Sequence, residues 1–177
     1  AYLGLPRRNG CRVVLKQEPW KIIFTDYRTG MPRDEYPYTI ITAKFVTTNN
    51  LRFTINRKTL KSKADATAGM QVIKMGDAEF DAAYDVRGND EEAVRDLLSN
   101  DELRRLMINQ PRFRMGIVDR EGVITRRHTP EKGFTDREFR ADVDVLHTSL
   151  NEDIADTDRL AGLCNIYVEM LKGLVRI

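Results

Sequence analysis

The chain has 177 residues, of which 32% are charged and 8% aromatic, and its formal net charge is +2. These values are ordinary for one soluble folded domain over residues 1–177, and so small a net charge argues against nucleic acid and anionic membranes as partners. No apolar run approaches the roughly 20 residues that a membrane-spanning helix needs. We therefore expect a cytoplasmic chain with no transmembrane segment. The chain begins at Ala1 without an initiator methionine, so an upstream membrane anchor stays open as an alternative.

The N-terminal part predicts two pairs of strands. Residues 1–10 contain glycine, proline and two arginines and are expected to form an extended arm. Residues 11–15 and 20–25 are strand-like, with Glu18-Pro19 between them. Residues 38–48 and 51–57 are also rich in β-forming residues, and Asn49-Asn50 between them predicts a hairpin, because asparagine tolerates the left-handed conformation of tight turns. Residues 59–69 fit a loop or a short helix equally well.

Segment 76–98 carries the clearest local pattern. From residue 77 to 86 apolar and acidic residues alternate, which predicts a strand with one buried face and one wet face. The apolar face would hold Phe80, Ala82, Tyr84 and Val86, and the wet face Asp77, Glu79, Asp81 and Asp85. Gly88 and Asn89 break the pattern, and an acidic first turn then opens a helix. Residues 90–109 fit one helix kinked at Ser99 or two short helices, ended by Gln110-Pro111.

The C-terminal part repeats this order of elements. Residues 112–118 and 123–127 flank a turn and predict a second hairpin. A further alternating strand would place Phe139, Ala141, Val143 and Val145 on its apolar face and Arg140, Asp142 and Asp144 on its wet face. Residues 153–175 predict a helix with an apolar stripe formed by Leu160, Leu163, Cys164, Tyr167, Met170, Leu171 and Leu174. The stripe favours a core position, with a homodimer interface as the alternative.

These elements predict an α+β fold. We expect a mainly antiparallel sheet with the helices of 90–109 and 153–175 on one face. A duplicated β-β-β-α unit is a further hypothesis, with pseudo-repeats at 36–109 and 111–177, because residues 80–86 and 139–145 share Phe, Ala, Asp and Val at matching positions. The two cysteines, Cys11 and Cys164, favour buried free thiols over a disulfide framework, and a single bridge is the alternative.

The order of motifs in the middle of the chain resembles a known family. Gly76-Asp77-Ala78-Glu79-Phe80-Asp81 is followed by Arg87-Gly88-Asn89-Asp90-Glu91-Glu92-Ala93-Val94-Arg95, and later by Gln110-Pro111 and Val118-Asp119-Arg120-Glu121-Gly122. This order is similar to that of an uncharacterised family of bacterial proteins of unknown function, and the resemblance runs from about residue 38 onward. It implies a small α+β protein with no established activity, and it assigns no catalytic or ligand-binding residue. Arg126-Arg127-His128 departs from the family, which often carries charged or acidic residues after that turn.

Enzyme chemistry has little support in the sequence. A hydrolase needs a nucleophile, a base and an orienting group, but the only histidines, His128 and His147, lie in no recognised motif. The acidic row of 77–85 could supply paired carboxylates or bind a hard cation, although acidic residues on a wet strand face are far more common. We therefore expect no metal, no cofactor and no assigned catalytic residue.

A basic patch is the candidate ligand site. It would consist of Arg112, Arg114, Arg126, Arg127 and His128, brought together by the predicted second hairpin, and it could hold phosphate or an anionic partner. A solvated charged face is the plainer interpretation. Three functions follow from the sequence. The first is a non-enzymatic module that binds a protein or small ligand, the second a small-ligand or lipid-binding domain with a pocket under the last helix, and the third a hydrolase using the acidic row.

Overall fold

The computed structural model describes residues 12–31, 34–47, 49–58, 70–119, 122–123 and 143–176. Its strands are β1 (Arg12–Gln17), β2 (Trp20–Met31), β3 (Asp34–Val46), β4 (Phe53–Arg57), β5 (Gln71–Ile73), β6 (Tyr84–Gly88), β7 (Arg114–Asp119), β8 (Gly122–Val123) and β9 (Val143–Leu150). Its helices are α1 (Ala78–Ala83), α2 (Glu91–Leu97), α3 (Asp101–Ile108) and α4 (Thr157–Arg176). The predicted arm 1–10, Cys11 and the segment 59–69 lie outside the described residues.

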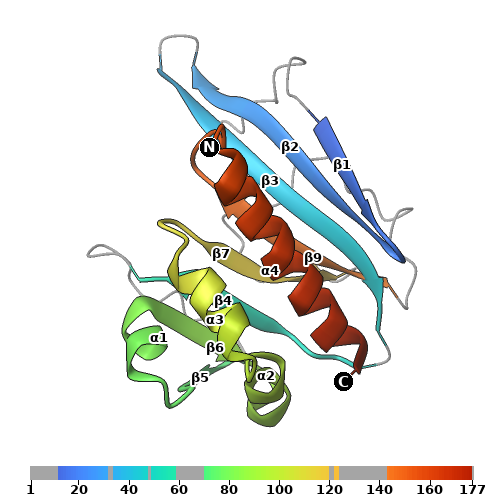
Figure 1. Ribbon diagram of the computed structural model, residues 1–177, viewed down its shortest axis with the longest axis vertical. Helices are drawn as coiled ribbons and strands as arrows, with labels where there is room; N and C mark the ends of the chain where they lie inside the picture. The colour runs from blue at the N-terminus through green and yellow to red at the C-terminus, as the bar shows by residue number, and fades with distance from the viewer. Residues whose placement is uncertain are drawn as a thin grey trace.

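The strands form one antiparallel sheet. Its order is β1-β2-β3-β9-β7-β4-β6-β5, with β8 paired to β7 (Figure 1). All neighbouring strands of the described part run antiparallel. This sheet, combined with the helices, confirms the predicted α+β class with a mainly antiparallel sheet.

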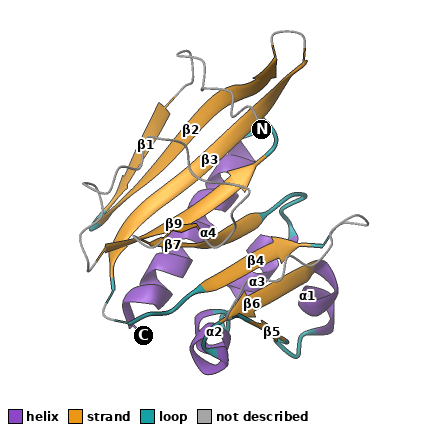
Figure 2. Cartoon of the chain, turned by 180° about the vertical axis from the view of Figure 1, so that it is seen from behind, coloured by secondary structure: helices purple, strands orange, loops and turns teal. Residues whose placement is uncertain are grey.

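One face of the sheet carries the core and the long C-terminal helix. Helix α4 lies across β3 and β9, with α3 beside it, and seen from behind the strands lie in front of these helices (Figures 1 and 2). We call this side of the sheet the front face and the opposite side the back face. Register places Phe24, Ile41 and Leu146 on the front face, and all three belong to the buried core.

The predicted apolar stripe of the last helix is confirmed as core. Leu163, Tyr167, Met170, Leu171 and Leu174 are buried, together with Ile166, whereas Leu160 and Cys164 are half-buried. The hydroxyl of Tyr167 donates a hydrogen bond to the carbonyl of Ile41 at 2.7 Å. The Tyr167 ring therefore fills the space between the middle of α4 and the sheet, where the pocket hypothesis would need room for a ligand. A homodimer through the outer side of α4 stays a prediction.

The two strands predicted on either side of Glu18-Pro19 are confirmed, and they pair as a hairpin. Strands β1 and β2 pair along their length around a turn at Glu18-Pro19, whose peptide bond is cis. Register places Gln17 opposite Trp20 and Lys16 opposite Lys21. Proline suits this position because a turn residue donates no hydrogen bond to the sheet.

The hairpin predicted around Asn49-Asn50 is wrong. Strand β3 pairs with β2 and β9, whereas β4 pairs with β6 and β7, so two strands separate β3 from β4 in the sheet. Thr47 and Asn49 form the bend after β3: the Thr47 hydroxyl donates to the side-chain oxygen of Asn49 at 2.8 Å. The chain leaves β3 there and crosses to the far side of β9 and β7.

The strand predicted over residues 77–86 is also wrong. Ala78–Ala83 is the helix α1, and the strand β6 begins only at Tyr84. Phe80 on the helix and Tyr84 on the strand both reach the core, and their rings stack with centroids 4.9 Å apart. The alternating apolar residues therefore belong to a helix and a following strand, and they do not mark one continuous strand.

The predicted faces of the strand ending at Val145 are reversed. Leu146 and Leu150 of β9 face the core, with Thr148 between them opposite Ile41. Val145 is buried on the back face, opposite Lys44. Residues 134–142 of the predicted strand lie outside the described residues.

The two halves do not share one strand order. In the first half β3 is not a neighbour of β4, whereas in the second half β7 pairs with both β8 and β9. The segment 80–86 that suggested the repeat is partly helical. The strand equivalence behind the duplication hypothesis is therefore wrong, although β7 and β8 do form the predicted second hairpin.

The predicted helical region 90–109 consists of two short helices. Asp90 is the N-cap of α2 and Asn100 is the N-cap of α3. The Asn100 side chain accepts hydrogen bonds from the backbone N–H groups of Glu102 and Leu103. Such capping satisfies backbone N–H donors that have no partner in the first turn of a helix. Of the two predicted alternatives, two short helices are therefore confirmed and one kinked helix is wrong.

Candidate functional site

The acidic residues of segment 76–98 lie around α1 instead of along one strand. Asp77 is the N-cap of α1, and its Oδ1 accepts hydrogen bonds from the backbone N–H groups of Glu79 and Phe80 at 3.1 and 3.0 Å. The bond from Phe80 is the main reason why the pKa of Asp77 lies below its ordinary value. This carboxylate satisfies a helix N-terminus within the chain.

Asp81 stabilises the turn that precedes α1. Its two carboxylate oxygens accept hydrogen bonds from the backbone N–H groups of Met75 and Gly76 at 2.9 and 3.1 Å. Gly76 has a φ of +81°, a left-handed conformation that residues with a side chain rarely adopt. The turn before α1 therefore depends on both Gly76 and Asp81.

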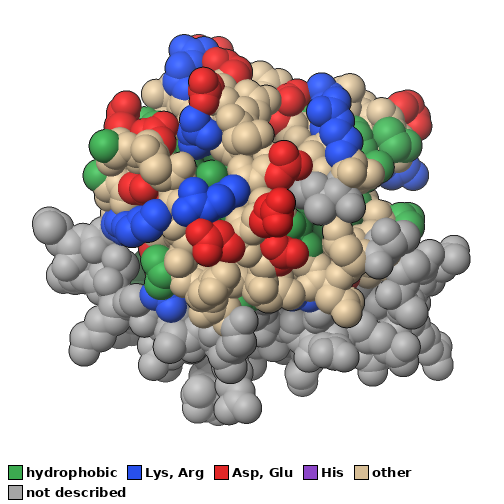
Figure 3. All heavy atoms as spheres, turned by 90° about the horizontal axis from the view of Figure 1, so that it is seen from below, with side chains coloured by type: hydrophobic (Ala, Val, Ile, Leu, Met, Phe, Trp, Pro, Cys, Tyr) green, Lys and Arg blue, Asp and Glu red, His purple; other side chains and the backbone are tan. Residues whose placement is uncertain are grey.

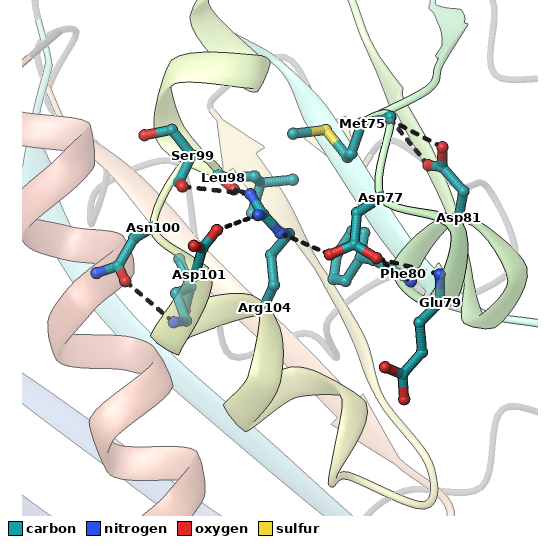
Figure 4. Close-up of polar contacts among 12 residues, drawn as sticks. Met75, Asp77, Glu79, Phe80, Asp81, Leu98, Ser99, Asn100, Asp101 and Arg104 are labelled. Atoms are coloured by element: carbon teal, nitrogen blue, oxygen red, sulfur yellow. Dashed lines mark hydrogen bonds and ion pairs between the residues drawn. The ribbon is translucent and has the colours of Figure 1, made fainter.

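Arg104 of α3 joins this turn to the connection between α2 and α3 (Figure 4). Its Nη1 donates to the carbonyls of Leu98 and Ser99 at 2.7 and 3.2 Å, and its Nε lies 3.3 Å from Oδ2 of Asp77. Its Nη2 donates to Asp101. We call Arg104, Asp77 and Asp101 the α1–α3 ion cluster. Both carboxylates of this cluster contact the same guanidinium, so each has a partner within the chain.

The side chain of Asn89, in the turn between β6 and α2, forms hydrogen bonds with the segment just before β4. Its side-chain oxygen accepts from the backbone N–H of Arg52 at 2.8 Å, and its amide nitrogen donates to the carbonyl of Asn50 at 2.6 Å. The following residue, Asp90, caps α2. The motif residues of segment 76–98 thus have structural roles, and the three carboxylates of Asp77, Asp81 and Asp85 serve separate contacts, the last with Arg87 at 2.9 Å.

The predicted basic patch is only partly within the described residues. Arg112 is exposed in the turn before β7, and its positive charge adds to a lowering of the pKa of Glu152 that is caused mainly by a hydrogen bond from Arg159. Arg114 is half-buried on β7, opposite Asn56 on the back face. Arg126, Arg127 and His128 lie outside the described residues, so their convergence with the first two stays a prediction.

The remaining chemistry-bearing residues are dispersed. His147 is half-buried on the back face of β9, opposite Thr42 and Gly116. Cys164 is a free, half-buried thiol on α4, and burial raises its pKa, which favours the protonated thiol. In the described ranges no three His, Cys, Asp or Glu side chains are grouped so that they could hold a metal ion.

A surface that the sequence interpretation missed lies on the first hairpin. Lys16 and Lys21 stand directly opposite each other on the back face of β1 and β2, and Arg12 lies on the same face of β1. All three are exposed, and none of them forms an ion pair within the described part of the chain. Val14 lies between Arg12 and Lys16 and is 44% exposed. We call Arg12, Val14, Lys16 and Lys21 the β1 edge.

The charges of the β1 edge are unfavourably placed. Like charges directly opposite each other in an antiparallel pair destabilise it, so the position of Lys16 is unfavourable for folding alone. By comparison, basic and acidic side chains lie close together on the face of the molecule that is seen from below (Figure 3). The sequence did contain the signal, since two strands joined by Glu18-Pro19 place Lys16 opposite Lys21.

No protein-family model matches the chain, and neither a curated protein nor a solved structure matches it. The resemblance to an uncharacterised bacterial family therefore rests on its motifs alone and stays a prediction. None of the helices that the structure describes is long and apolar enough to cross a membrane.

Proposed function

We propose that this protein is a non-enzymatic binding module and that its β1 edge contacts the partner. The observation that carries the proposal is the exposed pair of Lys16 and Lys21, which face each other without a carboxylate partner among the described residues. A partner that carries negative charge would offset the repulsion between these two lysines, which gives a reason for their position.

The location of β1 supports the same function. β1 is the last strand of the sheet, and among the described strands it pairs only with β2. Of its residues only Leu15 packs against the core, while Val13 and Val14 are 41% and 44% exposed. The strand thus buries little apolar area on folding, and the side chains of Val13 and Val14 remain exposed to solvent.

Site-specific photocrosslinking in the native host tests this function. A photoreactive benzoyl-phenylalanine replaces Val14 on β1 or, as the matched control, Val72, which is 53% exposed on β5 at the other end of the sheet. We expect a discrete protein adduct from position 14 and none from position 72. Equal adducts from both positions, or none from position 14, would contradict the proposal, as would a turnover activity that survives removal of the β1 edge charges.

A further inference from the structure

We propose that the β1 edge accepts an extended acidic segment of a partner protein as an additional strand of the sheet. This inference rests on the proposed function and specifies the chemistry of the partner. Terminal strands present backbone N–H and C=O groups along their outer side, and an extended peptide can satisfy them by strand addition. β1 meets this condition over its six residues, because the described part of the sheet continues only on its β2 side.

The back-face side chains of β1 determine which residues the partner must carry. An added strand would lie about 4.8 Å away, and its residues opposite Arg12, Val14 and Lys16 would point to the same face. Opposite charges in such cross-strand positions are favourable, as is an apolar residue opposite Val14. The partner segment is therefore acidic, apolar and acidic at every second position. Lys21 lies on β2, one strand farther from the added strand, and adds to the positive charge of this surface.

The same cations disfavour a second copy of this chain as the added strand. Two β1 strands paired in antiparallel fashion, with Val14 opposite Val14, would place Arg12 opposite Lys16 at both ends. Like charges in these positions disfavour the pair. Lysine on a terminal strand is also a known protection against aggregation, and that role alone would make the β1 edge inert toward peptides. A binding experiment separates the two roles.

Fluorescence anisotropy with the whole chain and two end-blocked synthetic peptides provides this experiment. The first peptide carries glutamate, valine and glutamate at alternate positions with threonines between them, and the second has lysine in place of glutamate. We expect the glutamate peptide to bind at least about tenfold more tightly than the lysine peptide, with affinity falling as salt rises.

Charge reversal on β1 shows whether this surface is responsible. We expect Lys16→Glu to weaken binding of the glutamate peptide about tenfold, whereas Lys74→Glu, an equal charge change just after β5, alters it less than about twofold. The double variant Arg12→Glu/Lys16→Glu should prefer the lysine peptide. Because Lys16→Glu replaces a repulsive pair with an attractive one, its melting temperature should equal or exceed that of the wild type. Loss of binding then cannot be due to unfolding, and a lower melting temperature contradicts the repulsion that the inference uses.

Hydrogen exchange identifies the binding mode. Strand addition should slow amide exchange in Arg12–Gln17 when the glutamate peptide is bound. Unchanged exchange in β1, equal binding of both peptides, or undiminished binding by Lys16→Glu overturns the inference. If neither peptide binds, strand addition by an acidic segment is wrong, and the crosslinks from position 14 decide independently whether the proposed function still holds.

Discussion

The guanidinium of Arg104 in α3 lies 3.3 Å from the carboxylate of Asp77, the N-cap of α1. This contact joins two helices that are separated along the chain by β6 and α2. The same guanidinium holds the carbonyls of Leu98 and Ser99 at the end of α2. One half-buried arginine therefore fixes how three short helices meet, none of which is long enough to be stable alone.

Replacing Arg104 with methionine should destabilise the fold. The variant removes the donor of two carbonyls and the positive charge beside Asp77, and we expect a loss of about 1–3 kcal/mol in the free energy of unfolding, measured by urea denaturation. Arg105→Met is the control, because Arg105 is 69% exposed and, within the described residues, pairs with Glu102 of its own helix. Its effect should stay within about 0.5 kcal/mol. Similar losses from both variants would show that the cluster does not hold the helices together.

The left-handed backbone conformation of Gly76 supports a second prediction. A methyl group at Gly76 would meet no atom within 4 Å, so the cost of Gly76→Ala comes from the backbone alone. At a φ of +81° this cost is about 1–2 kcal/mol, visible as a lower urea midpoint. Gly76→Asn should lose less, because asparagine adopts the left-handed region more readily. If alanine and asparagine cost the same, conformation at this turn is not the cause.

The sequence predicted local pairing of strands better than the order of strands in the sheet. Hairpins of neighbouring strands were predictable, as with β1 and β2, because a short turn fixes their register. The separation of β3 from β4 was not, because β9 and β7 lie between them in the sheet, and pairing between distant segments leaves no local signal. Ala78–Ala83 consists largely of helix-forming residues after a capping Asp77, so propensity indicated a helix while periodicity indicated a strand.

Buried polar residues explain the reversed faces of β9. Asp144 was assigned to the wet face because of its charge, yet it is buried and accepts a hydrogen bond from Arg52 at 3.0 Å. Only the fold reveals a partner so distant in sequence. The candidate site had the same limitation: the carboxylates of segment 76–98 were visible in the sequence, but their N–H and Arg104 partners were not.

The contact between Tyr167 and β3 supports a third prediction. Removing the hydroxyl in Tyr167→Phe deletes its 2.7 Å hydrogen bond to the Ile41 carbonyl inside the core. We expect a loss of about 1 kcal/mol, seen as a lower melting temperature by circular dichroism. Tyr36→Phe removes the same group from a side chain that is 63% exposed and should leave the melting temperature unchanged. Equal shifts in the two variants would contradict a role for the buried bond.

Acid should weaken the fold through Glu152. Its two carboxylate oxygens accept hydrogen bonds from Nη2 and Nη1 of Arg159 at 2.5 and 2.8 Å, and this pair lowers the pKa of Glu152 below its ordinary value of 4.5. Because the folded-state pKa is the lower one, the unfolded chain binds the proton first as the pH falls. The stability contributed by the pair is therefore complete above the unfolded-state pKa and is lost as the pH falls through the folded-state value.

Glu152→Gln removes this titration and provides the test. Urea denaturation between about pH 7 and pH 3 should show the wild type losing unfolding free energy more steeply than Glu152→Gln in the acid part of the range. At neutral pH the variant should be the less stable of the two, because Arg159 keeps its charge in a half-buried site with a neutral partner. The two curves should thus approach each other as the pH falls. Parallel curves would mean that the carboxylate of Glu152 has the same proton affinity in the folded and unfolded chain, and that its contact with Arg159 does not stabilise the fold.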